Sequence, residues 1–260
     1  MSKTFHHIYG PVYSWRLGYS LGIDPLSRSK KICNMDCIYC QLGVTSQLEN
    51  HRYSHVSVNE IIEELHKVHL HAIDYITFSG RGEPTLAANL GEMIDAVKVS
   101  YKKNVAVITN SAMIYMDDVQ QDLAKADFVL AKLDAGTQKD FDYINGNWKI
   151  SFEKIVQGLK IFRQHYKGKF ALQIMLMPQN IDKVKDIADV ARNINPDEIE
   201  LNTPLRACAI KPMDSAQMQE AEKFFSGMHV ITVFGSCPQN VQAIDEKATA
   251  NRHGKTRKQD

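Results

Sequence analysis

The chain has 260 residues, of which 44% are hydrophobic and 23% are charged, and its formal net charge is +1. This balance is typical of a soluble globular protein and excludes a chain whose overall charge attracts polyanions. No apolar run reaches the roughly 18 residues of a membrane-spanning helix, and the amino-terminal MSKTFHHIYG lacks the apolar stretch of a signal peptide. We therefore expect no membrane contact and a cytoplasmic location.

Apolar strand-like segments and amphipathic helices alternate along most of the chain. SVNEIIEELHKVH opens with a capping-box pattern from Ser57 to Glu60 and then repeats apolar residues at helical spacing. The pattern predicts helices near 57–69, 90–97, 119–126, 152–162 and 184–191, and strands at 19–24, 72–80, 104–110, 127–136, 170–178 and 198–204.

The predicted strands are nearly continuous apolar runs, which favours a parallel sheet covered by helices. Six such units predict an α/β fold with an incomplete (β/α)6 barrel. We expect one domain over residues 1–240, followed by a helix or a disordered basic tail at 241–260. Polar and glycine-rich residues gather after the strands, where the loops of such barrels converge on the chemistry.

Three of the five cysteines, Cys33, Cys37 and Cys40, lie within eight residues. An odd number of cysteines crowded in this way argues against a secreted disulfide framework and favours metal chemistry in a reducing compartment. Thiolates suit structural zinc or an iron–sulfur cluster. A zinc site needs a fourth ligand, and no other cysteine or histidine stands at a typical paired spacing. A four-iron cluster normally takes four cysteines, so three would leave one iron open to a small molecule.

The Cys-x3-Cys-x2-Cys spacing resembles the radical S-adenosylmethionine (SAM) superfamily, and the resemblance runs from about Tyr9 to Pro204. GRGEPT, with Gly80, Gly82 and Glu83, follows the next predicted strand, where that superfamily has a Gly-Gly-Glu motif; here an arginine separates the first two glycines. YGPVYSWRLGYSLGID, TFSGRGEPTL and LNTPLR look like a group of Fe–S oxidoreductases loosely related to the tRNA wybutosine-synthesis enzymes. The wybutosine enzyme needs a second cluster, for which this chain has no second cysteine triad, so that activity is not assigned.

The resemblance implies a radical SAM barrel with a [4Fe-4S] cluster on Cys33, Cys37 and Cys40. It implies that SAM chelates the fourth iron and is cleaved by one electron to a 5′-deoxyadenosyl radical, which abstracts hydrogen from a substrate. The electron would come from an external donor of the flavodoxin or ferredoxin type.

The resemblance also implies roles for residues beside the triad. Tyr39 would lie near the adenine, with an ordinary core aromatic as the alternative. Gly80 and Gly82 suit a backbone that approaches the methionine end of SAM. Glu83 is expected either to accept hydrogen bonds from the α-ammonium of SAM or to support the turn from its base.

Asn110, Lys132 and Asp134 stand at the ends of the next two predicted strands. A lysine in an apolar strand is costly to bury without a partner. Lys132 is therefore assigned to the SAM carboxylate and Asp134 to the ribose hydroxyls, with a structural pair between the two as the alternative. Gln173 and Asn202 are cofactor-site candidates of the same kind or internal hydrogen-bond partners.

Cys208 follows the last predicted strand and belongs at the same rim, as a candidate hydrogen-atom donor or as a buried, unreactive cysteine. RNA modification is suggested by the resemblance and by the basic clusters SRSKK and NRHGKTRKQD, which could contact phosphate or be solvated. A glycyl-radical-enzyme activase and a zinc-stabilised, non-catalytic binding module are the alternatives.

Overall fold

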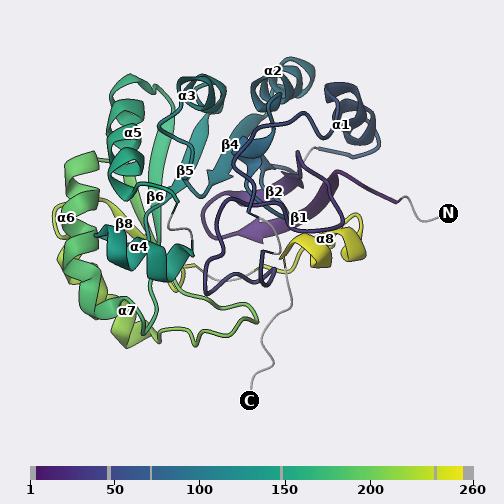
Figure 1. The fold of residues 1–260 in the computed structure, drawn as a ribbon. Helices are drawn as coiled ribbons and strands as arrows, with labels where there is room; N and C mark the ends of the chain where they lie inside the picture. Colours follow the sequence, from purple (N-terminus) through teal and green to yellow (C-terminus); the bar gives the residue numbers. More distant parts are fainter. Residues whose placement is uncertain (1–3, 46–47, 71, 147–148, 237–238, 254–260) are drawn as a thin grey trace.

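A computed structural model describes residues 4–45, 48–70, 72–146, 149–236 and 239–253. It shows one curled eight-stranded sheet whose strands are ordered as in the sequence (Figure 1). The first strand is antiparallel to the second, and all later neighbours are parallel. The strands are β1 (Ile8–Ser14), β2 (Gly18–Ile23), β3 (Tyr75–Phe78), β4 (Asn104–Thr109), β5 (Phe128–Lys132), β6 (Lys169–Met175), β7 (Glu198–Asn202) and β8 (Val230–Thr232).

Helices follow most of the parallel strands and cover the outer side of the sheet (Figure 1). The α-helices are α1 (Val58–Leu65), α2 (Leu90–Tyr101), α3 (Asp117–Leu123), α4 (Gln138–Asn145), α5 (Phe152–His165), α6 (Val184–Ile194), α7 (Ser215–Glu222) and α8 (Glu246–His253). Three short 3₁₀ helices are η1 (Pro84–Leu86), η2 (Ile181–Lys183) and η3 (Lys223–Phe225). None of the described helices is both long and hydrophobic enough to span a membrane.

The incomplete barrel predicted from the sequence is confirmed, and the six predicted strands are β2 to β7. Two strands were not predicted. β1 contains Pro11 and an irregular register between Tyr9 and Val12, which the sheet tolerates because β1 is an edge strand. β8 has only three residues, too few for a periodic pattern.

The two faces of the sheet differ because side chains alternate along each strand. One face packs against the helices to form the main apolar core. The predicted capping box confirms the start of α1: Ser57 Oγ accepts from Glu60 N at 3.3 Å and Glu60 Oε2 accepts from Ser57 N at 2.8 Å. On the inner face, Leu17 from the β1–β2 turn packs on four apolar residues, namely Ala106, Phe128, Leu130 and Ala171. This apolar cluster lies toward the amino-terminal ends of the strands. The inner face at their carboxyl-terminal ends is therefore left for polar side chains.

The C-terminal helix α8 lies beside β1 (Figure 1). Its Arg252 Nε donates to Asp24 Oδ2 at 2.9 Å, and both side chains are buried just beyond the end of β2. Part of the segment predicted as a helix or a basic tail is therefore helical, and residues 254–260 lie outside the described residues.

Candidate cofactor site

The cysteine loop, residues 31–43, lies in the connection from β2 to α1 at the carboxyl-terminal edge of the sheet. Backbone hydrogen bonds attach it on two sides. The N–H of Glu83 donates to Ile32 O at 3.1 Å, and the N–H of Asp36 donates to Asn145 O at 2.9 Å. The loop is thus held between the end of β3 and the end of α4, although it contains no helix or strand of its own.

Two thiols of the cysteine triad each lie near a side-chain amide N–H donor. Asn110 Nδ2 lies 3.5 Å from Cys33 Sγ, and Asn145 Nδ2 lies 3.3 Å from Cys37 Sγ. Burial raises the pKa of Cys33 to about 12 and also raises the pKa of Cys37. Burial opposes the charge of Lys31, but the neighbouring sulfurs, above all that of Cys40, raise its pKa. Buried thiolates therefore need a bound cation, because burial alone keeps them protonated.

This donor set fits an iron–sulfur cluster. Three soft sulfur ligands with amide donors to two of them, and an ammonium group nearby, are the surroundings that such clusters use. In the described part of the chain, no three histidine, cysteine, aspartate or glutamate side chains converge on one metal-ion position. Each cysteine of an iron–sulfur cluster binds a different iron, so this donor set does not require such convergence.

A hydrogen-bonded group of three side chains, Tyr39, Asp134 and Lys132, lies next to Cys37. The Tyr39 hydroxyl donates to Asp134 Oδ2, the Lys132 ammonium donates to the Tyr39 hydroxyl, and Lys132 Nζ lies 3.7 Å from Asp134 Oδ2. Leu133 packs in the outer core, and because side chains alternate along a strand, Lys132 and Asp134 on either side of it share the inner face. The Lys132 ammonium also lies 4.3 Å from the centre of the Tyr39 ring.

The Asp134 carboxylate already has its hydrogen-bond partners within the chain. Its side chain is completely buried and also accepts from Asn145 Nδ2 at 3.1 Å and from the Met175 backbone N–H at 2.9 Å. The geometry favours the structural alternative for Asp134, whereas the partly exposed Lys132 can reach a ligand. Contact of either residue with SAM stays a prediction.

Glu83 is also bonded within the chain. Its carboxylate accepts from Thr85 Oγ1 at 2.7 Å, from Thr109 Oγ1 at 2.6 Å and from Asn110 N at 2.6 Å. Burial raises its pKa, and these hydrogen bonds oppose that rise. The geometry matches the role of supporting the turn from its base. Because Asn110 also contacts Cys33, Glu83 links the end of β4 to the cysteine loop.

The two glycines of GRGEPT are required by the packing of the protein itself. Gly80 has φ +150°, and a Cβ there would meet the Asp24 carboxylate. A Cβ on Gly82 would collide with the backbone carbonyl of Ile32. These contacts account for both glycines without a ligand, and an approach to SAM stays a prediction.

The remaining residues that the sequence analysis assigned to the site are Gln173, Asn202 and Cys208. Gln173 accepts a hydrogen bond from Arg16 on the inner face. Asn202 Oδ1 accepts from Thr203 N at 2.9 Å, which is a local contact. Cys208 packs with Tyr39 in a small cluster that also contains Met175, so it lies on the same side as Cys37.

Two contacts of the site were not predicted. Asn145 ends α4, a helix that the sequence analysis overlooked, although the Asn-Gly pair at 145–146 is a helix-end signal. Lys31 belongs to the basic cluster SRSKK, and nothing in its sequence surroundings shows that it turns back to the cysteines. Both contacts depend on how loops far apart in the sequence pack.

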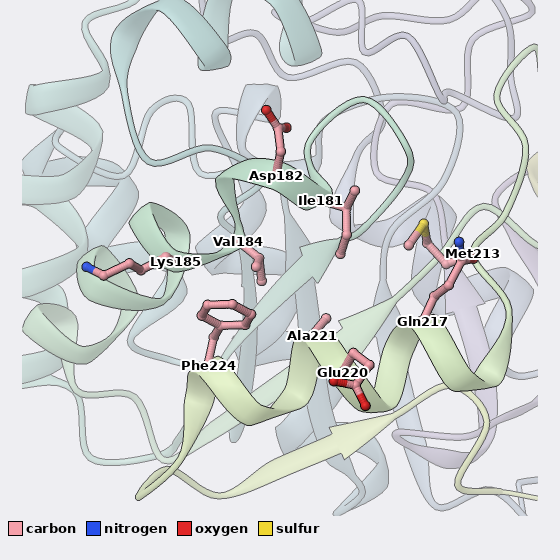
Figure 2. A pocket seen from close by; sticks show the side chains of 9 residues that line it. All are labelled: Ile181, Asp182, Val184, Lys185, Met213, Gln217, Glu220, Ala221 and Phe224. Carbon is pink, nitrogen blue, oxygen red and sulfur yellow. The ribbon is translucent and has the colours of Figure 1, made fainter.

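A separate groove lies on the outer layer, between α6 and α7 (Figure 2). Val184, Met213 and Phe224 line it, with Asp182 and Glu220 at its edges. None of the sequence-predicted site residues lines it, so the groove does not belong to the cofactor site.

We expect Glu83→Ala to destabilise the protein by about 2–4 kcal/mol, because it leaves buried donors of Thr85, Thr109 and Asn110 without an acceptor. We also expect weaker SAM binding, since Asn110 loses its anchor. Urea unfolding and calorimetric titration with SAM measure the two effects, and Glu83→Gln, which keeps one acceptor oxygen, should lose less stability. Unchanged stability in Glu83→Ala would contradict the supporting role.

A family model of the radical SAM superfamily matches residues 29–191, which include the cysteine loop and the strands β3 to β6. The chain is 36% identical over 253 residues to a protein named GTPase Obg from Brachyspira hyodysenteriae; the match covers 94% of this chain but 36% of that protein. The chain thus spans about a third of the length of that relative. It is 34% identical over 254 residues to a UPF0026 protein of Synechocystis, with 96% of this chain and 92% of the relative covered.

Solved structures resemble this fold. The structure of TYW1 with a lysine-pyruvate adduct bound has a TM-score of 0.64 and 16% identity, over 80% of this chain and 74% of that one. Streptococcus suis SuiB bound to S-adenosylmethionine has a TM-score of 0.63 and 16% identity, over 81% of this chain and 49% of that one. At such identities the likeness concerns the fold.

Proposed function

The chain belongs to the radical SAM superfamily and is therefore an iron–sulfur enzyme that uses a [4Fe-4S] cluster and SAM, and we propose that it abstracts a hydrogen atom from a substrate held against the inner face of the half-barrel. When bound, the cluster and SAM supply the electron transfer and the 5′-deoxyadenosyl group for this step. The observation that supports the proposal is the direct contact between the cysteine loop and the polar inner face, through Asn110, Asn145 and Tyr39.

Each residue of the site has a distinct role in this proposal. Cys33, Cys37 and Cys40 ligate the cluster. Lys132 is partly exposed on the inner face and binds the SAM carboxylate. Asp134 holds Lys132 and the Tyr39 ring in place and is a positioning residue. Enzymes of this superfamily generally take their electron from an external donor, and a flavodoxin or ferredoxin is our proposal for it.

RNA is the substrate class that we propose. Arg28 and Lys30, which precede the cysteine loop, are exposed, and Arg81 follows β3. All three lie in loops at the carboxyl-terminal edge of the sheet, the same edge as the cysteines. Because the net charge is only +1, attraction of a polyanion would depend on such local cations.

The test uses the anaerobically reconstituted protein with dithionite and SAM. A visible absorbance that dithionite bleaches reports the cluster, and formation of 5′-deoxyadenosine reports SAM cleavage. We expect total cellular RNA to raise 5′-deoxyadenosine formation above the background and to yield a nucleoside of altered mass by mass spectrometry. Arg81→Gln, outside the cysteine loop, should reduce the RNA-dependent part and leave the background intact.

Two results would contradict parts of the proposal. A colourless protein that binds zinc and does not cleave SAM would indicate a non-catalytic binding module. SAM cleavage that RNA does not stimulate, together with a glycyl-radical signal in a partner protein by electron paramagnetic resonance, would indicate an activase.

A further inference from the structure

Arg16 lies inside the half-barrel, away from the cysteines. It belongs to the β1–β2 turn, its Nη1 donates to Gln173 Oε1, and the same atom lies 3.6 Å from Glu200 Oε2. Gln173 and Glu200 are register partners on β6 and β7. Gln173 shares the face of Ala171, which packs in the inner cluster. The hairpin turn thus places a guanidinium against the inner face of β6 and β7.

A second guanidinium, that of Arg206, lies near Arg16. Arg206 follows β7; its Nη1 donates to the backbone oxygen of His253 at 2.7 Å, and its Nη2 lies 2.9 Å from His253 Nδ1. Burial and the nearby Arg16 lower the pKa of Arg206. Burial and the same two guanidiniums lower the pKa of His253 to about 3, so its imidazole is neutral. Arg206 is therefore bonded to a neutral ring, and Arg16 lies near enough to influence both groups.

Within the described part of the chain, the two positive charges are only partly balanced. Among the described residues, Glu200 is the one carboxylate within ion-pair distance of Arg16, and none lies within that distance of Arg206. Burial raises the pKa of Glu200 to about 7, so at neutral pH it supplies only part of a negative charge. Arg16 Nε and both carboxylate oxygens of Glu200 are buried and have no hydrogen-bond partner among the residues that the structure describes. The buried N–H at Arg16 Nε needs an acceptor, which an oxyanion of another molecule would supply. The Glu200 oxygens, as acceptors, give no support to an oxyanion.

We propose that Arg16 and Arg206 bind an oxyanion of the substrate, either a phosphate or a carboxylate, on the inner face of the half-barrel. The inference rests on the proposed function, since it concerns the substrate of that site. Guanidinium forks match both oxyanions with paired hydrogen bonds. Gln173, the partner of Arg16, is also the register partner of Lys132 across β5 and β6. The bound oxyanion would therefore fix the substrate one strand away from the residue assigned to SAM.

The test is calorimetric titration of the anaerobically reconstituted protein with inorganic phosphate and, separately, with acetate, at matched ionic strength. We expect saturable binding of at least one probe, and the tighter probe distinguishes a phosphate from a carboxylate substrate. Arg206→Gln and Arg16→Gln should each weaken that binding by at least about tenfold, as expected for the loss of a charge-assisted pair. Arg163→Gln removes an arginine paired to Asp197 on the outer surface and serves as the matched control.

A third variant separates a binding role from a purely structural one. Glu200→Gln removes the carboxylate beside Arg16 but keeps the side-chain shape, so we expect it to tighten binding of the same probe about tenfold. A structural Arg16–Glu200 pair predicts no such gain. His253→Gln removes the ring contact of Arg206 without removing its charge, and should bind at least as well as the unmodified protein.

Cluster absorbance and uncoupled formation of 5′-deoxyadenosine are measured on every variant. If cluster absorbance and uncoupled 5′-deoxyadenosine formation are normal while Arg206→Gln no longer binds the probe, the result supports the oxyanion site whatever the substrate is. Equal binding by the unmodified protein, Arg16→Gln and Arg206→Gln, or no saturable binding of either probe, overturns the inference. A parallel loss of SAM affinity in Arg206→Gln also overturns it, since the site would then belong to SAM.

Discussion

Cys37→Ala is expected to lose the iron–sulfur cluster and, with it, all formation of 5′-deoxyadenosine. Two thiolates should not retain a cluster that three hold, because each binds a different iron. The structure adds a second reason: Asn145 Nδ2 donates to Cys37 Sγ, and the same amide links the loop to Asp134. Iron and sulfide analysis after anaerobic reconstitution, together with the visible spectrum, measures the loss.

Cys208→Ala is the matched control for this variant. Cys208 packs near Cys37, in the cluster that contains Tyr39, but lies outside the cysteine loop. Its replacement should leave iron, sulfide and uncoupled SAM cleavage intact, and a loss of substrate turnover alone would support its proposed role as a hydrogen-atom donor. A full complement of iron in Cys37→Ala would remove that residue from the ligand set.

Asp134→Ala is expected to destabilise the protein by about 3–5 kcal/mol. Its carboxylate is fully buried and accepts from Tyr39, Asn145 and the Met175 backbone, so alanine leaves three donors and the Lys132 charge without their acceptor. Urea unfolding of the reconstituted protein measures the loss. Cluster content should fall as well, because the Asn145 amide is shared with Cys37.

Lys132→Met separates the positioning role of Asp134 from direct binding of SAM. Asp134 keeps three hydrogen-bond donors in this variant, so we expect a stability loss of only about 1–2 kcal/mol. Uncoupled formation of 5′-deoxyadenosine should slow, because Lys132 is assigned to the SAM carboxylate. Normal SAM affinity and cleavage in Lys132→Met would leave the pair with a structural role alone.

Much of the fold could be read from the sequence because its signals are local. The apolar runs predicted β2 to β7, and the Ser57–Glu60 spacing predicted the start of α1. The alternation of side chains along a strand is itself a local signal, and it puts Lys132 and Asp134 on one face, where they meet. β1 was missed because Pro11 breaks the strand pattern, and only a position at the sheet edge makes that proline acceptable.

The sequence by itself determined the cysteine triad, the alternation of strands and helices, and the superfamily, since each depends on the spacing of residues close together in the chain. Only the tertiary structure decided which partner each polar side chain finds. The carboxylate of Glu83 accepts hydrogen bonds from Thr109 and Asn110, and Arg16 reaches Glu200 across the half-barrel. A buried charge must be satisfied by whatever donor the packing brings close, and no local spacing states which one that is.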